Sequence, residues 1–292
     1  MVIFMHMRTF GITKEIGYKE VNLADSDNII NKIYEIDNKS RKCIVTIPDG
    51  CIDIEFIVKD GKFNSFLCGS RDEGAFSEVG SYDYCFGIRF QPGINPIVNP
   101  VTGSLFVNEE NVSNKKNGGN KIDLSEVVNA RININGYIEM NKMTGRILEG
   151  FKNDSFENKV DYFIQICNKR QINKNGQGKN EVDITKFAVG FLIDEIMQKD
   201  GAVNISRLVE KTGYSQCYIN RIFKMNTGFS VKKYAEIIRL QKSISLLNKN
   251  GCERVYNELG YYDQSHFIKS FKRFTMFTPK KYVENAAQIK FI

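Results

Sequence analysis

Cysteine and histidine, the side chains that most often carry chemistry, are scarce or unsuitably spaced in this 292-residue chain. The only histidines are His6 and His266, so a catalytic triad that pairs a nucleophile with histidine has at most two candidate bases. Seven cysteines stand at positions 43, 51, 68, 85, 167, 217 and 252; they form no Cys-x-x-Cys pair, and their odd number does not suit a disulfide framework. We therefore expect no enzymatic activity, no metal site and no cofactor.

Basic side chains, which bind anions, gather near the C-terminus. The chain has a formal net charge of +7, and residues 187–292 carry 17 Lys and Arg against 9 Asp and Glu, a net charge of +8. The remainder is therefore close to neutral. From charge alone, a solvated surface and a polyanion-binding surface are equally good interpretations.

An internal repeat occupies the same basic segment. Residues 215–234 match residues 263–282 at an offset of 48. Each copy predicts a short helix, a glycine turn and a second helix, the latter capped by Ser215 or Asp263. This is the pattern of a helix-turn-helix, whose second helix lies in the major groove of DNA. The short first helices are expected at Ile205–Lys211, capped by Asn204, and at Cys252–Leu259.

The outward positions of the two second helices carry side chains that pair with base edges or neutralise phosphates. The inward positions are apolar and are expected to form core. For any single outward residue, a plain solvated role stays open beside base contact. The candidate DNA-binding residues are Gln216, Cys217, Asn220, Arg221 and Lys224 in the first copy, and Gln264, Ser265, His266, Lys269 and Arg273 in the second.

The segment Ser230–Asn248 between the copies is nearly free of helix breakers and predicts one connecting helix. Its length of roughly 28 Å approaches the roughly 34 Å between successive major-groove faces. Two recognition helices on this connector could enter adjacent grooves. Met276 stands where the first copy has Gly228, so the second recognition helix either ends differently or holds a left-handed methionine.

The segments GYSQCYINRIFKMNTGFSVKKY and GYYDQSHFIKSFKRFTMFTPKKY resemble the DNA-binding domain of AraC/XylS-type transcriptional regulators. The resemblance implies two helix-turn-helix units joined by a long helix. It also implies base contacts by exposed residues early in each recognition helix. Bulkier residues replace the usual small alanine at Val209 and Tyr256, which opposes close interhelix packing. The positions that match the contacting residues are Cys217, Asn220 and Arg221, then Ser265, His266 and Lys269.

The remainder of the chain predicts a separate domain. Residues 171–180 have linker composition, so we expect a regulatory, ligand-binding or dimerisation domain at 1–170, a linker at 171–180 and the DNA-binding domain at 181–292. The predicted class is α+β, with an antiparallel β domain, a small barrel or sandwich with added helices, before an all-α domain. The expected strands are Cys43–Ile47, Ile52–Val58, Phe63–Leu67 and Tyr84–Phe90, with turns at 69–80, a polar loop at 108–121 and helical periodicity over 123–168.

Two N-terminal segments, IPDGCID and FGIRFQPG, resemble the sensory domains that precede this DNA-binding domain in one subgroup of the family. Arg89, within a predicted strand, is either an edge arginine of an antiparallel sheet or, with Asp53, part of a polar pocket for an anionic or amphiphilic effector. The helices within 123–169 either form a homodimer interface or pack on the strand domain.

Together these observations predict a cytoplasmic, sequence-specific regulator of transcription that binds double-stranded DNA and is controlled by its N-terminal domain. The resemblance favours activation and implies RNA polymerase as a partner. No membrane span or secretory signal is expected. The alternative is a DNA-targeted enzyme or repair protein with a reactive cysteine, but no cluster of basic or metal-binding residues is available to activate a thiolate.

Overall fold

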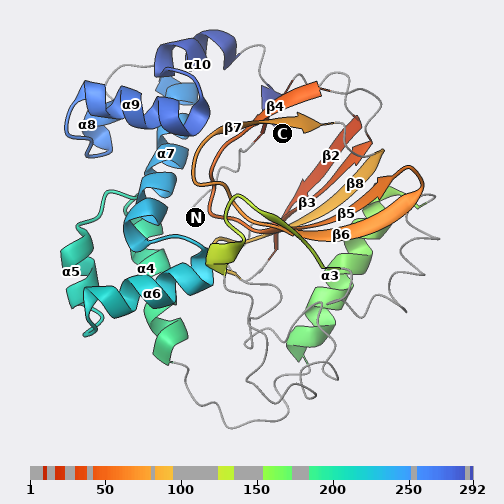
Figure 1. The fold of residues 1–292 in the computed structure, drawn as a ribbon, viewed down its shortest axis with the longest axis horizontal. Helices are drawn as coiled ribbons and strands as arrows, with labels where there is room; N and C mark the ends of the chain where they lie inside the picture. Colours follow the sequence, from red (N-terminus) through yellow and green to blue (C-terminus); the bar gives the residue numbers. More distant parts are fainter. Residues whose placement is uncertain are drawn as a thin grey trace.

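The computed structural model describes residues 9–11, 17–23, 30–37, 42–79, 83–94, 124–134, 154–172, 184–250, 255–286 and 290–291. A β domain built on antiparallel sheets lies beside a helical domain, as Figure 1 shows. The α+β class predicted from the sequence is confirmed.

Two antiparallel sheets form the N-terminal domain. The six-stranded sheet has the spatial order β2-β3-β8-β5-β6-β9, and the four-stranded sheet has the order β10-β1-β4-β7. The strands are β1 (Thr9–Gly11), β2 (Gly17–Asn22), β3 (Ile30–Asp37), β4 (Lys42–Thr46), β5 (Asp53–Lys59), β6 (Lys62–Cys68), β7 (Ala75–Val79), β8 (Tyr84–Phe90), β9 (Arg131–Asn133) and β10 (Lys290–Phe291). Because β10 pairs with β1, the C-terminal segment returns to the N-terminal domain.

One face of the six-stranded sheet packs on helix α3 (Phe156–Ile172). Alternate residues of β5 and β8 point to this face, as the period of two in a strand requires. The ring of Phe163 on α3 lies 5.8 Å from that of Phe56 and 5.3 Å from that of Phe86. The described part of the 123–169 segment thus packs on the strand domain, one of the two roles expected for it.

In the described part of the C-terminal domain, every regular element apart from β10 is a helix. Its helices are α4 (Ile184–Gln198), α5 (Ile205–Glu210), α6 (Gln216–Thr227), α7 (Val231–Asn250), α8 (Val255–Glu258), α9 (Gln264–Thr275) and α10 (Pro279–Ala286). Helix α7 connects the pair α5 and α6 to the group α8, α9 and α10 (Figure 1). The predicted connecting helix and both recognition helices are therefore present. Helix α8 is shorter than the predicted Cys252–Leu259, whose start lies outside the described residues.

The structure corrects two expectations about the N-terminal domain. The segment 69–80 contains strand β7, which pairs with β4, and is not all turn. The described segment 124–133 is not a regular helix: it is a single 3-10 turn, η2 (Leu124–Glu126), followed by β9. Asn129 has a left-handed φ of 60° that reverses the chain, so that Ile132 pairs with Leu67 on β6.

Other boundaries lie partly beyond the described residues. Helix α3 extends through Ile172, so the first two residues of the expected linker are helical. The rest of the linker, 173–180, and the polar loop expected at 108–121 lie outside the described ranges. Ile138 and Ile147, which contributed to the helical periodicity, do so too.

The two domains touch along α7 and at the ends of both recognition helices. Gln241 on α7 donates a hydrogen bond to the carbonyl of Pro48. The backbone N–H of Gly74 donates to the carbonyl of Arg273 at 3.1 Å. At Gly228 a Cβ would lie 2.7 Å from Val128 and 3.0 Å from the carbonyl oxygen of Leu124, so the first recognition helix ends directly against the N-terminal domain.

Met276 has a left-handed φ of 66° at the C-terminus of α9, and Gly228 has a φ of 84° at the end of α6. We expect Met276→Gly to raise the free energy of unfolding by about 1 kcal/mol, because glycine removes the Cβ clash. Gly228→Ala should destabilise by more than about 1 kcal/mol, because it combines the same strain with the contact to Val128. Denaturant titrations of the two variants check both signs, and a destabilised Met276→Gly variant would contradict the strain argument.

Candidate nucleic-acid interface

The first helix-turn-helix unit is set by local capping. The side chain of Asn204 accepts a hydrogen bond from the N–H of Arg207 and begins α5, and that of Ser215 accepts from the N–H of Tyr218 and begins α6. Ile219 and Phe223 are buried on the inner face of α6. The opposite face is therefore directed to solvent, as the repeat predicted.

The outer face of α6 exposes Gln216, Cys217, Arg221 and Lys224. Asn220 is only partly exposed, and both ends of its amide are occupied. Its Oδ1 accepts from the N–H of Val231 at 3.3 Å, and its Nδ2 donates to the carbonyl of Gln216 at 3.1 Å. In the free protein Asn220 thus joins α6 to the start of α7.

Two tyrosines flank the outer face of α6, and sequence reasoning did not select them. The rings of Tyr214 and Tyr218 are 5.1 Å apart, and the Arg221 guanidinium carbon lies 5.4 Å from the centre of the Tyr218 ring. A cation over an aromatic face gains electrostatic attraction, so this contact limits where Arg221 points. The spacing of three residues between Tyr218 and Arg221 on one helix could have revealed it.

The second unit repeats the arrangement. The Asp263 side chain accepts from the N–H of His266 at 2.6 Å and begins α9, whose inner face buries Phe267, Phe271 and Phe274. The outer face exposes Gln264, Ser265, His266, Lys269 and Arg273. Both sets of candidate residues therefore lie on the surfaces that the repeat predicted.

Arg273 differs from the other candidates because acidic residues engage it. Its Nη2 lies 2.9 Å from Glu236 on α7, and its Nε lies 3.8 Å from Glu73 of the N-terminal domain. The guanidinium also covers the Phe274 ring at 4.5 Å. A DNA phosphate must compete with these carboxylates for Arg273.

Helix α7 adds two basic residues that sequence reasoning missed, Lys232 and Arg239. Both line a hollow between the two units, together with His266 and Lys269 of α9. Lys232, Glu236 and Arg239 share one face of α7 at helical spacing, a pattern readable in the sequence once the connecting helix is assigned.

The structure brings the weaker candidates, Asp53 and Arg89, together as a buried ion pair. The Arg89 side chain donates two hydrogen bonds to Asp53, at 2.7 and 2.6 Å, and lies 3.4 Å from Asp49. Strand β8 lies between β3 and β5, so the expectation of an edge arginine was wrong. The Tyr34 hydroxyl lies 3.0 Å from both Asp53 and Glu55, and these two carboxylates share its one donated proton.

Burial alone lowers the pKa of Arg89, but Asp53 and Asp49 outweigh this effect and hold the pKa well above its ordinary value. The guanidinium is therefore charged at any physiological pH. Its donors already face carboxylates, so an anion that binds here has to displace Asp53.

Two of the described cysteines, Cys68 and Cys85, are not activated as thiolates. Burial raises the pKa values of Cys68 and Cys85 well above the ordinary value, and the Glu55 carboxylate adds to the effect. These two thiols stay protonated at neutral pH and are poor nucleophiles. Within the described ranges, no three His, Cys, Asp or Glu side chains come together as a metal site.

This geometry defines a class: two capped helix-turn-helix units with exposed polar recognition faces, held on one connecting helix. A family model described as a helix-turn-helix domain matches residues 208–285. Residues 208–285 are thus similar to the helix-turn-helix domains of AraC-type regulators. Among the described helices, none has the length and hydropathy to cross a bilayer.

Curated relatives match this chain over about a third of its length. The HTH-type transcriptional regulator MtrA of Neisseria gonorrhoeae is 31% identical over 103 residues, which is 34% of each chain. The Msm operon regulatory protein of Streptococcus mutans is 28% identical over 87 residues, 29% of this chain and 31% of that protein. The matches thus span about a third of the length of these relatives.

Among solved structures, ToxT from Vibrio cholerae aligns over 95% of this chain and 98% of its own, with 10% identity and a TM-score of 0.35. That TM-score is too low to establish a shared fold for the whole chain.

Arg221 and Lys269 hold equivalent positions in the two recognition helices and should act differently. Arg221→Ala should weaken duplex binding by about 1–3 kcal/mol and flatten the preference at particular bases, because a planar guanidinium can pair with guanine O6 and N7. Lys269→Ala should weaken binding more uniformly and reduce the salt slope by about one. Binding titrations over salt and over single-base variants of the site separate the two. If Lys269→Ala changes base preference while Arg221→Ala changes only the salt slope, the roles are reversed.

The buried pair of Arg89 and Asp53 should be structural. Arg89→Met should lower the free energy of unfolding by about 3–5 kcal/mol, because it leaves the Asp53 carboxylate buried without its cation. The double variant Arg89→Met with Asp53→Asn should recover part of this loss, since the unpaired charge is gone. Thermal and denaturant unfolding of the full chain measure both. A single variant as stable as the natural protein would show that the pair has no structural role.

Proposed function

We propose that this protein is a sequence-specific, duplex-DNA-binding regulator of transcription without enzymatic activity. The observation that carries the proposal is the pair of capped recognition helices, α6 and α9, whose exposed faces bear Asn, Gln, Arg and Lys side chains. These are the side chains that read base edges and neutralise phosphates.

The spacing of the two units supports binding to adjacent major grooves. Helix α7 has 20 residues and so a length of about 30 Å. Successive major-groove faces on one side of a duplex are roughly 34 Å apart. Because both recognition helices pack on α7, they are suited to enter two successive major grooves on the same side of the duplex.

The N-terminal domain is proposed to control this binding. It contacts α7 through Pro48 and Gln241, and it contacts the end of α6 through Leu124. A change in the N-terminal domain can therefore shift how the recognition helices are held, provided that a ligand binds one state better than the other. The proposed triggers are a small anionic or amphiphilic effector that displaces Asp53 from Arg89, or formation of a homodimer.

The regulatory output is proposed to be activation, with RNA polymerase as the protein partner and the cytoplasm as the site of action. The resemblance of the C-terminal domain to AraC/XylS-type regulators supports activation. The geometry of the two helix-turn-helix units does not distinguish an activator from a repressor.

Selection of bound sequences from a random duplex pool tests the proposal. The full-length protein should enrich a site with two conserved blocks about one helical turn apart, because two recognition helices on α7 read adjacent grooves. Arg221→Ala should blur one block and leave the other intact. Circular dichroism first establishes that the protein is folded. If the folded protein then enriches no sequence over competitor DNA, sequence-specific binding is refuted.

A further inference from the structure

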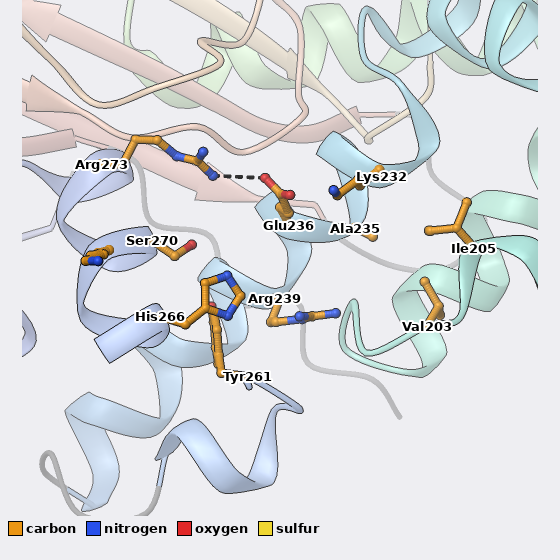
Figure 2. A pocket seen from close by; sticks show the side chains of 11 residues that line it. Val203, Ile205, Lys232, Ala235, Glu236, Arg239, Tyr261, His266, Ser270 and Arg273 are labelled. Atoms are coloured by element: carbon orange, nitrogen blue, oxygen red, sulfur yellow. Dashed lines mark hydrogen bonds and ion pairs between the residues drawn. The ribbon is translucent and has the colours of Figure 1, made fainter. Parts of the chain in front are cut away.

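A cavity of about 410 Å³ lies between the two helix-turn-helix units (Figure 2). Its floor is α7, one wall is the recognition helix α9, and the opposite wall is the turn before α5 together with the first residue of that helix, Val203 and Ile205. The cavity is thus shared by both units, and the described residues that line it all belong to the helical domain. This cavity is the hollow described above between the two units, and the proposed base contacts do not require a ligand inside it.

The cavity is strongly basic. Lys232, Arg239, Lys269 and Arg273 line it, and Glu236 is the one acidic residue among the described lining residues. Figure 2 shows that Glu236 points to Arg273, and their ion pair at 2.9 Å uses the carboxylate. The other three cations have no carboxylate within 4 Å in the described part of the chain. A positive field concentrated in a concave surface attracts anions.

Arg239 is incompletely satisfied. Its Nη2 donates to the carbonyl of Gly201 at 2.7 Å, and its guanidinium lies 5.4 Å from the centre of the Tyr261 ring. Its Nε is shielded from solvent and has no hydrogen-bond acceptor among the described residues. A shielded donor on a charged group costs free energy unless an acceptor reaches it, and a charged acceptor gains most.

Two donors from the recognition helix complete the surroundings. His266 packs edge-on against Tyr261 at 5.6 Å, and Ser270 presents a hydroxyl on the same wall. Hydroxyl, imidazole, ammonium and guanidinium groups together match the oxygens of a phosphate. The Glu236 carboxylate repels a phosphate only weakly, because its charge is paired with Arg273.

We propose that this cavity is an oxyanion site that receives a phosphodiester group of the bound duplex, from the backbone that crosses between the two major grooves. The proposal rests on the proposed function and deepens it, because it adds α7 to the DNA-binding surface. The duplex is favoured over a free anion as the source because His266, Lys269 and Arg273 belong to the recognition helix itself. When α9 enters a groove, the backbone beside that groove lies against the same wall.

The test uses the full-length protein with Lys232→Gln, since Lys232 is exposed and belongs to neither recognition helix. Losing one neutralised phosphate should reduce the salt slope of binding by about 0.9 and weaken binding by about fivefold at 0.15 M salt, equally for every sequence. The matched control is Lys62→Gln, which removes an equal charge from the hairpin between β5 and β6 in the N-terminal domain. This control should leave both quantities unchanged.

Inorganic phosphate, titrated at constant ionic strength, distinguishes the two sources of phosphate. If the cavity serves the duplex, phosphate should compete with DNA for the natural protein more strongly than for Lys232→Gln. A Lys232→Gln protein with unchanged DNA affinity and salt slope would overturn the proposal, and phosphate binding lost in that variant would then identify a site for a free anion. A variant that changes base preference would also overturn it, since backbone contacts are uniform.

Failure of the proposed function gives a different result. In that case the natural protein binds no duplex with sequence preference, and Lys232→Gln and Lys62→Gln reduce its residual non-specific binding equally. Circular dichroism and melting temperatures confirm that each variant is folded before binding is measured.

Discussion

The arrangement of both recognition helices depends on the burial of a single helix, α7. Its side chains supply the shared core of the helical domain: the Tyr234 ring meets that of Phe223 in the first unit at 5.4 Å, and Ser243 contacts the hydroxyl of Tyr261 in the second at 3.3 Å. Since interiors are close-packed, neither unit can turn relative to α7 without opening voids. The distance between the two reading faces is therefore a property of the core rather than of a loop.

The same helix is where the N-terminal domain meets the helical domain. Ile47 packs in the helical core, and the Tyr234 ring lies so close to Gly50 that a Cβ there would be 2.9 Å away. Such contacts leave little space for intermediate positions, so a shift of the N-terminal domain has to move α7 or separate from it. This gives a physical route from an effector to both recognition helices, without contact between effector and DNA.

Local signals explain what the sequence could predict. The caps Asn204, Ser215 and Asp263 act within one turn of chain, so local sequence predicted them. At Met276 the sequence left two helix endings open, and the structure has the left-handed one. Strand β7 and the position of Arg89 inside the sheet depend on which strands pair, which spacing alone does not determine. The cavity could not be predicted from the sequence, because its lining residues belong to α5, the turn before it, α7 and α9. Only the packing on α7 brings these elements together.

The two recognition helices are held by the N-terminal domain in unequal ways. At α9 the contact includes the ion pair of Glu73 and Arg273, but both side chains are substantially exposed and 3.8 Å apart, and such pairs contribute only about 0–1 kcal/mol. The hydrogen bond from Gly74 to the Arg273 carbonyl depends on a close backbone approach, since a Cβ at Gly74 would lie 2.4 Å from the Phe274 carbonyl oxygen. Release of Arg273 from Glu73 is therefore inexpensive, whereas separation of the backbones is not. DNA binding can recruit Arg273 while the domains stay docked, and control by the N-terminal domain can act through α7 as well as through the contacts at Gly74 and Gly228.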